Sequence, residues 1–299
     1  RESPPDAYDG IDAPDFQLAL DKMLRNSRIR TAHSDSPSIW AWRAGRARKV
    51  AKAADDVLCI LPFEAPLYAE HAVDAVFVGH PKADAAPALV DAAAARRALD
   101  IGDGELVAIL PGSRRGEVAH LGDILANTAQ RLVAARPGIR FVTPVATPAL
   151  RELIELRLNE AGVAEHFLLL DGDAETAMTA ADLVLLASGT AALEAALLCK
   201  PMVAVYRMAK VTAALVKGLR LVKLTHYTLP NLMTSEPLVP EFIQDDARPE
   251  AIAAAVVELL DDPDRRRFIS DEFAKLKAEL ALNADQHAAE AVLALAQST

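Results

Sequence analysis

The chain has 299 residues, of which 25% are charged, and its formal net charge is −10 at pH 7. This length predicts about two domains that each bury a core of their own. The negative charge argues against a general nucleic-acid binder, because affinity for the phosphate backbone comes from clustered Lys and Arg. Cys59 and Cys199 lie far apart without metal-ligand spacing, so we predict no zinc site and no disulfide framework.

The apolar stretches of the chain are too interrupted to cross a membrane. The longest, around residues 180–206, is broken by Ser188, Thr190, Glu194 and Lys200. We recognise no signal peptide in the sequence. A cytoplasmic location is therefore expected.

Strand patterns alternate with amphipathic helix patterns along the chain. We predict strands at residues 7–11, 29–32, 56–60, 75–78, 106–110, 140–143, 167–170, 183–186 and 202–205. We predict helices at residues 15–26, 65–71, 121–135, 148–161, 190–198 and 249–260, and a closing helical region at 264–297. This alternation favours α/β domains with parallel sheets that helices cover on both faces.

A run rich in alanine and proline at residues 83–98 predicts a linker and then a helix start, so we place the domain boundary there. We expect a partial first domain at residues 1–80, a second domain at 81–280, and a C-terminal helix at 281–299 that packs back on the first domain. The first domain has fewer predicted strands than a doubly wound sheet normally has, and the chain begins with Arg1. We therefore expect a fragment whose first domain is truncated.

The segment from Leu185 is an apolar strand that leads into Ser188-Gly189-Thr190 and then into an alanine-rich helix. Gly189 lets a ligand approach the backbone, and the N–H groups and dipole of the first helical turn favour a diphosphate. Glu194, on the same helix face as Thr190, is suited to accept hydrogen bonds from ribose hydroxyls. An ordinary helix N-cap is the alternative interpretation of Ser-Gly-Thr.

A second loop of this kind, Gly112-Ser113-Arg114, stands between a predicted strand and a predicted helix. Arg114 can give charge-assisted hydrogen bonds to a phosphate or to a leaving nucleotide. A Pro-Gly turn with a solvated arginine is the alternative. Two such loops in one domain favour a nucleotide site.

Two carboxylates near the start of the chain need different explanations. Asp15 follows Pro14 at a predicted helix start, where it is interpreted as an N-cap. Asp12 stands at the carboxyl end of a predicted strand, where it is the better candidate for a general base.

Nine motifs follow one another along the chain: GIDAPDF at 10–16, SPSIWAWR at 36–43, LPFE at 61–64, FVGHP at 77–81, LPGSR at 110–114, LLLDG at 168–172, ASGTAALEAALL at 187–198, PMVAVYR at 201–207 and LPN at 229–231. In this order they resemble the lipid-A-disaccharide synthases, inverting glycosyltransferases of the GT-B fold. The resemblance implies two Rossmann-like parallel-sheet domains that face a cleft. It also implies that UDP-2,3-diacylglucosamine donates its sugar to 2,3-diacylglucosamine 1-phosphate, which yields the β-1,6-linked precursor of lipid A and UDP.

The resemblance also suggests roles for single residues. Asp12 would take the proton of the acceptor hydroxyl as this attacks the anomeric carbon, and Arg114 and the helix start at Ser188 would stabilise the departing UDP. Tyr206, Asn231 and Gln244 match polar family positions near the donor. The alternatives are a core role for Tyr206 and a cap or turn role for Asn231.

No metal ion or other cofactor is expected, because helix dipole and arginine can stabilise the leaving UDP. The triplet Asp171-Gly172-Asp173 spells the acidic motif of metal-dependent glycosyltransferases. It follows a predicted strand, and Asp-Gly tends to form turns, so we interpret it as a solvated turn.

Because both substrates carry acyl chains, the resemblance implies peripheral contact with the inner-membrane surface. Two segments combine apolar residues with cations. One is Trp40-Ala41-Trp42-Arg43, followed by Arg46, Arg48, Lys49 and Lys52, and the other is residues 210–223, with Lys217, Arg220 and Lys223. Ordinary half-buried helices are the alternative for both.

Three departures from the family pattern bear on function. The family's amino-terminal region has no counterpart in these residues, Ser34-Asp35 replaces an aromatic and an aliphatic residue, and Asp9 falls in a strand expected to be apolar. The alternatives to the synthase are therefore a UDP-binding module without turnover and another GT-B enzyme, such as a UDP-N-acetylglucosamine 2-epimerase.

Overall fold

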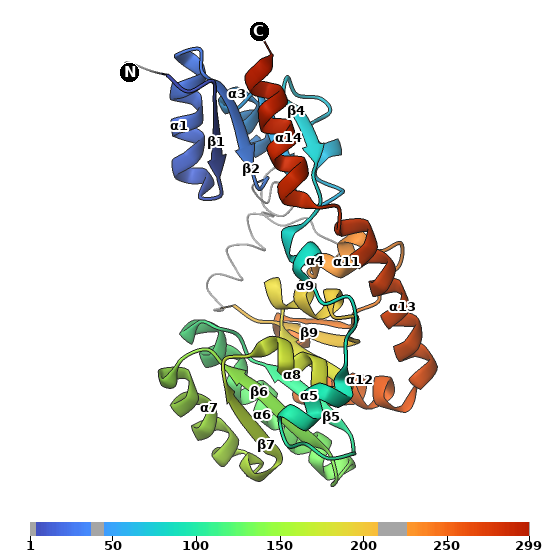
Figure 1. The fold of residues 1–299 in the computed structure, drawn as a ribbon. Helices are drawn as coiled ribbons and strands as arrows, with labels where there is room; N and C mark the ends of the chain where they lie inside the picture. Colours follow the sequence, from blue (N-terminus) through green and yellow to red (C-terminus); the bar gives the residue numbers. More distant parts are fainter. Residues whose placement is uncertain (1–3, 37–44, 209–225, 299) are drawn as a thin grey trace. The chain divides into compact units, whose positions relative to one another are not determined.

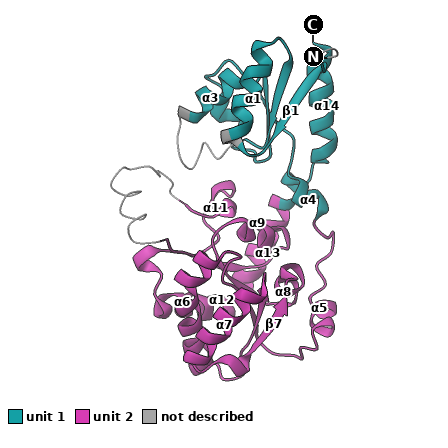
Figure 2. Ribbon diagram, turned by 90° about the vertical axis from the view of Figure 1, so that its left-hand side faces the viewer, with its two compact units in different colours: residues 1–85, 216–225, 277–299 teal, residues 86–215, 226–276 magenta. Residues whose placement is uncertain are grey.

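A computed structural model describes residues 4–36, 45–208 and 226–298 of the chain (Figure 1). The chain forms two compact units, which Figure 2 colours separately. Among the described residues, the first unit comprises 4–85 and 277–298, and the second comprises 86–208 and 226–276. Each unit contains one parallel sheet, which confirms the α/β class predicted from the sequence.

The first sheet has the order β1-β2-β3-β4, and all neighbouring strands are parallel. The strands are β1 (Ala7–Ile11), β2 (Arg30–Ser34), β3 (Asp56–Cys59) and β4 (Asp74–Phe77). Each corresponds to a predicted strand, with small differences at the ends. Their carboxyl ends therefore lie at one edge of the sheet, which is where Asp12 follows β1.

Helices cover both faces of the first sheet. Figure 2 shows α1 (Pro14–Asn26) and α3 (Gly45–Ala53) on one side of β1, and α14 (Ala284–Gln297) on the other. Helix α14 contacts β1 and β2. A short 3-10 helix, η1 (Ala65–Tyr68), stands where a longer helix was predicted, and α4 (Pro81–Ala85) follows β4.

The start of α1 corrects one prediction. The helix begins at Pro14, its N-cap position is Ala13 in a left-handed conformation with φ 42°, and no side chain caps it. Asp15 therefore lies in the first turn and not at the cap. Proline at the first helical position lacks an N–H and has a suitable φ, so this start needs less help from a capping side chain.

The second sheet has the order β10-β9-β8-β5-β6-β7, and all of its strand pairs are parallel. The strands are β5 (Leu106–Leu110), β6 (Arg140–Val145), β7 (Phe167–Asp171), β8 (Leu183–Ala187), β9 (Met202–Tyr206) and β10 (Glu241–Ile243). Every residue of β5 is buried, which explains its continuous apolar sequence. Strand β10 was not predicted, because three residues at a sheet edge give almost no periodic signal.

The helices of the second unit are α5 (Ala92–Ala98), α6 (Arg115–Ala135), α7 (Pro148–Glu160), α8 (Ala174–Ala180), α9 (Thr190–Leu197), α11 (Leu229–Met233) and α12 (Pro249–Asp261), with 3-10 turns η2 (Ala164–His166) and η3 (Gln244–Asp246). Helix α13 (Pro263–Leu280) begins in this unit and ends in the first. Helix α6 begins earlier than predicted because its first turn is polar. None of the described helices is both long and apolar enough to span a membrane.

Candidate functional site

Four neighbouring strands bring the predicted donor residues to one edge of the second sheet. In the order β10-β9-β8-β5 the carboxyl ends lie side by side, because all three pairs are parallel. At these ends stand, in the same order, Gln244, Tyr206, Ser188–Thr190 and Gly112–Arg114. Open α/β sheets bind ligands just outside the carboxyl ends of their strands. We call this set of strand ends the carboxyl edge.

The loop between β8 and α9 leaves an open helix start. Gly189 is the N-cap residue, and no side chain caps the helix. The backbone N–H of Ser188 donates to the carbonyl of Val205 over 2.8 Å, and its hydroxyl donates to the carbonyl of Tyr227 over 3.3 Å. Ser188 is therefore not a side-chain N-cap. A Cβ added to Gly189 would meet no atom within 4 Å. This uncapped start beside open space is the arrangement that binds phosphate.

The predicted ribose contact lies one turn further along α9. Thr190 is exposed and Glu194 is half-buried. Residues four apart share a helix face, so both side chains lie on the same side of α9. Contact between Glu194 and a ribose stays a prediction.

In the loop between β5 and α6, a side chain of the protein accepts the hydrogen bonds of the backbone N–H groups. The backbone N–H groups of Ser113 and Arg114 donate to the carboxylate of Glu117 over 3.0 and 3.3 Å. Gly112 has a φ of 109°, and a Cβ there would lie 2.5 Å from Oε2 of Glu117, so this position requires glycine. The Arg114 side chain is 84% exposed and lies 3.4 Å from Glu117. The loop therefore offers an exposed cation to an external phosphate, while the N–H of Ser113 is already engaged.

Tyr206 is linked to this second loop by charge. Burial raises the pKa of its phenol, and the negative charge of Glu117 raises it further. Tyr206 ends β9, two strands away from β5, which leads to Glu117. The negative charge of Glu117, in the first turn of α6, therefore acts on the phenol at the end of β9. Tyr206 is half-buried and not plain core.

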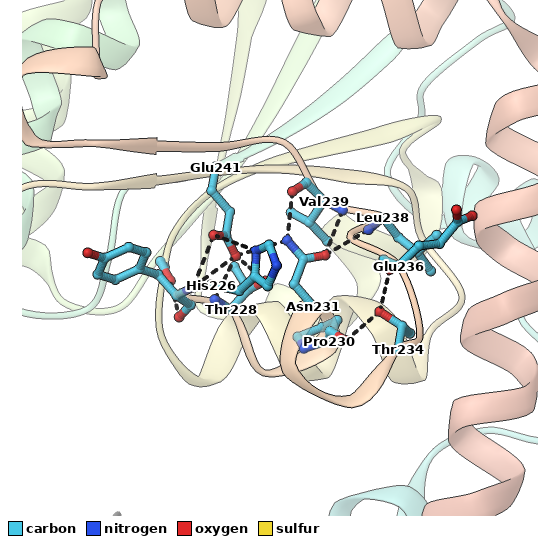
Figure 3. Close-up of polar contacts among 11 residues, drawn as sticks. His226, Thr228, Pro230, Asn231, Thr234, Glu236, Leu238, Val239 and Glu241 are labelled. Carbon is cyan, nitrogen blue, oxygen red and sulfur yellow. Dashed lines mark hydrogen bonds and ion pairs between the residues drawn. The ribbon is translucent and has the colours of Figure 1, made fainter. Parts of the chain in front are cut away.

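Glu241, at the start of β10, is a polar centre that the sequence analysis missed (Figure 3). Its Oε1 accepts hydrogen bonds from the backbone N–H and the hydroxyl of Thr228, over 2.8 and 2.7 Å. Both of its carboxylate oxygens accept from the N–H of Tyr227, over 3.1 and 3.0 Å. A single glutamate between apolar residues forms no sequence pattern that predicts hydrogen bonds to a distant loop.

Asn231 holds the loop beside Glu241. Its amide nitrogen donates to Glu241 over 3.0 Å and to the carbonyl of Val239 over 2.8 Å, and its oxygen accepts from the N–H groups of Leu238 and Val239 (Figure 3). These contacts use both donors and both acceptor sites of the amide. Asn231 is only 4% exposed. These hydrogen bonds hold a turn, as the alternative interpretation of Asn231 expects, and its contact with the donor stays a prediction.

In the first unit, Asp12 follows β1 directly and is exposed. Its backbone is left-handed, with φ 51°, and its N–H donates to the carbonyl of Ser34 over 3.2 Å. Asp35 follows β2 in the same way. Burial, and then the negative charge of Asp12, raise the pKa of Asp35. The carboxyl ends of β1 and β2 are thus followed by two acidic groups, of which Asp12 is the more accessible to a substrate.

Two of the departures from the family pattern meet in space. The hydroxyl of Ser34 lies 2.9 and 2.8 Å from the two carboxylate oxygens of Asp9, so the polar residue in β1 has a partner on β2. A second polar pair lies deeper: Nδ1 of His33 is 2.8 Å from Asp21, and both side chains are fully buried. Gly10 allows Asp21 this position, since a Cβ there would lie 2.5 Å from its Oδ1. Polar pairs therefore join α1, β1 and β2 below Asp12.

The acidic triplet after β7 has structural partners. Asp171 lies 2.7 Å from Arg151, and Asp173 accepts the N–H of Thr176 over 3.1 Å at the start of α8. Within the ranges that the structure describes, no group of three or more His, Cys, Asp or Glu side chains could hold a metal ion. Of the two segments predicted to contact a membrane, residues 40–43 and 210–223 lie outside the described residues, while Arg46, Arg48, Lys49 and Lys52 of the first segment lie on α3.

Comparisons of the sequence with protein families and with single proteins all find lipid-A-disaccharide synthases. A family model described as lipid-A-disaccharide synthetase matches residues 1–295. A lipid-A-disaccharide synthase from Alkalilimnicola ehrlichii is 46% identical over 299 residues, which cover 99% of this chain and 78% of the relative. One from Pseudomonas aeruginosa is 48% identical over 297 residues, with 99% and 77% covered.

Solved structures show the same fold at low identity. A UDP-GlcNAc 2-epimerase from Neisseria meningitidis, bound to UDP-GlcNAc, matches with a TM-score of 0.63 and 14% identity over 97% of this chain and 76% of the other. A glycosyltransferase from Rickettsia africae matches with a TM-score of 0.56 and 9% identity over 94% and 80%. Two parallel-sheet domains of the GT-B type are thereby confirmed.

Proposed function

The chain belongs to the lipid-A-disaccharide synthase family of glycosyltransferases, and on this premise we propose its substrates and the residues that act on them. The donor is UDP-2,3-diacylglucosamine and the acceptor is 2,3-diacylglucosamine 1-phosphate. The reaction forms a β-1,6 bond between the two sugars and releases UDP.

The carboxyl edge of the second sheet supports the donor half of this proposal. The open start of α9 and the exposed Arg114 follow β8 and β5, which are paired neighbours. A helix N-terminus and a guanidinium both stabilise a diphosphate, and they do so more strongly as negative charge develops on the leaving group. We assign Gly189, Thr190 and Arg114 to the diphosphate and Glu194 to the ribose.

The remaining donor residues receive supporting roles. Tyr206 and Gln244, at the ends of β9 and β10, are assigned to the donor groups beside the diphosphate. Gly112 and Ser113 shape the loop that carries Arg114, because Glu117 engages the N–H of Ser113. Asn231 holds the turn that leads to Leu238 and Val239 through its hydrogen bonds to their backbone groups.

The first unit is assigned to the acceptor, with Asp12 as the general base. A primary sugar hydroxyl is a weak nucleophile, so its attack on the anomeric carbon needs a group that accepts its proton. Exposure of Asp12 at a strand end is consistent with that task. The hydroxyl oxygen forms the new bond while the bond to the UDP oxygen breaks on the opposite face, and one such displacement inverts the configuration.

We further propose that the protein works in the cytoplasm at the surface of the inner membrane. Both substrates are anionic lipids whose acyl chains favour an apolar phase. Contact would be peripheral.

Product analysis by mass spectrometry tests the proposal. The chain is mixed with both substrates in detergent, alongside Asp12→Asn and, as a matched control, Asp6→Asn, which changes an exposed carboxylate before β1. Disaccharide formed by the wild type and by Asp6→Asn, and lost in Asp12→Asn, supports both the reaction and the base. UDP binding without any disaccharide would instead identify a UDP-binding module.

A further inference from the structure

We propose that Glu241 is a positioning residue of the donor site, which holds the segment His226–Thr228 against Ser188 and so sets the start of α9 for an anion. This inference rests on the proposed function, since it concerns the same site. Within the part of the chain that the structure describes, the hydrogen bonds of Glu241 go to Tyr227, Thr228 and Asn231, so it acts through the segment that it binds.

The side chain of Glu241 acts only as an acceptor of hydrogen bonds in its contacts with the neighbouring loop. Four hydrogens point to it, from the N–H groups of Tyr227 and Thr228, the hydroxyl of Thr228 and the amide of Asn231 (Figure 3). A carboxylate can accept from all of them, whereas a glutamine would turn an N–H toward one of these donors. The side chain is 10% exposed, so water has little access to these hydrogen bonds.

One peptide group connects Glu241 to the start of α9. The N–H of Thr228 donates to Glu241 over 2.8 Å, and the carbonyl on the other side of the same peptide bond, that of Tyr227, accepts from the Ser188 hydroxyl over 3.3 Å. Hydrogen bonds at both ends of a peptide group polarise each other. Thr228 is 1% exposed, so water cannot readily replace the bond to Glu241.

The position of Ser188 makes this connection relevant to a ligand. Ser188 immediately precedes Gly189, the N-cap residue of α9, where no side chain caps the helix. Without the Tyr227 carbonyl as its acceptor, the Ser188 hydroxyl would be free to turn toward the N–H groups of the first turn. Held by Tyr227, the hydroxyl is directed away from those groups. Glu241 therefore keeps the helix start open for a phosphate.

Isothermal titration with UDP measures this effect. We compare the wild type with Glu241→Gln and with a control, Glu236→Gln. The control makes the same charge change on an exposed glutamate five residues before Glu241. Loss of hydrogen bonds to a buried charge predicts that the Kd for UDP rises about tenfold in Glu241→Gln. Glu236→Gln is expected to bind as the wild type does.

Two further readouts separate positioning from general stability. Amide hydrogen exchange in Glu241→Gln is expected to accelerate most at Tyr227 and Thr228, whose N–H groups lose their acceptor. A double-mutant cycle with Ser188→Ala is expected to be non-additive in UDP affinity, because both substitutions break the same connection.

Each contrary result has a distinct meaning. Wild-type affinity in Glu241→Gln, or additive effects with Ser188→Ala, would overturn the positioning role. Failure of the wild-type chain itself to bind UDP would instead count against the proposed function.

Discussion

The starts of α6 and α9 share a strand–glycine–helix pattern but differ in what satisfies their backbone N–H groups. At α6, the Glu117 carboxylate accepts the N–H groups of Ser113 and Arg114. Glu117 is the third residue of that helix, and α9 has Ala192 at the same position. The pattern thus predicts a helix start with unpaired donors, but the side chain two residues beyond the first helical position decides whether a ligand can use them.

The largest expected effect is that of Gly112→Ala at the closed helix start. A left-handed φ of 109° and a Cβ 2.5 Å from Glu117 both penalise alanine there. We expect the free energy of unfolding to fall by about 2–4 kcal/mol, measured by urea denaturation. Gly138→Ala, at a site with no atom within 4 Å of the new Cβ, is the control. Equal stability of the two variants would contradict the close contact with Glu117.

Gly189→Ala tests the open helix start. The new methyl group meets no protein atom within 4 Å, so stability should change little. It would, however, enter the space assigned to the diphosphate, and we expect UDP to bind about tenfold more weakly or worse. Titration calorimetry and thermal unfolding measure the two effects. Unchanged UDP affinity would show that the ligand does not approach this glycine.

Glu117→Ala gives α6 the residue that α9 carries at the same position. The N–H groups of Ser113 and Arg114 then lose the Glu117 carboxylate as their acceptor, and water replaces it because the loop is exposed. We expect a loss of about 1 kcal/mol in the free energy of unfolding by urea. Glu160→Ala, which removes a surface partner of Arg157 on α7, is the control and should cost less. A larger loss in the control would reverse this ranking.

The smallest expected effect is on Tyr206 in the same Glu117→Ala variant. The pKa of the phenol is raised first by burial and second by the charge of Glu117. Removal of that charge should lower the pKa part of the way toward the ordinary tyrosine value, because burial remains. A titration followed by NMR of labelled tyrosine measures it. An unchanged pKa would mean that Glu117 and Tyr206 do not interact.

Much of the fold could be predicted because buried parallel strands are continuous apolar runs. The strands β5, β8 and β9 are of this kind, and parallel pairing then places the predicted residues after them at one edge. The short edge strand β10 gives no such run and escaped prediction. The predicted start of α1 was one residue late and its predicted N-cap two residues late, because Pro14 and Asp15 both favour a helix start.

The candidate site was predicted less completely, because two of its organising groups depend on contacts between distant residues. Glu241 binds a segment more than ten residues away, and no local pattern reveals that pairing. Glu117 looks like any acidic residue in a first helical turn. Only the folded structure shows that the Glu117 carboxylate accepts hydrogen bonds from the N–H groups of the loop before its helix. The same holds for Asn231, because its four hydrogen-bond partners cannot be read from the sequence.

An NMR titration of the ¹⁵N-labelled chain with UDP tests the central claim most directly. The claim is that UDP binds at the open start of α9 and not at the backbone of the α6 start. We predict that the amide signals of Gly189, Thr190 and Ala191 shift most, with smaller changes at Ser113. Largest shifts at Ser113 and Arg114, with Gly189 and Thr190 unmoved, would contradict it.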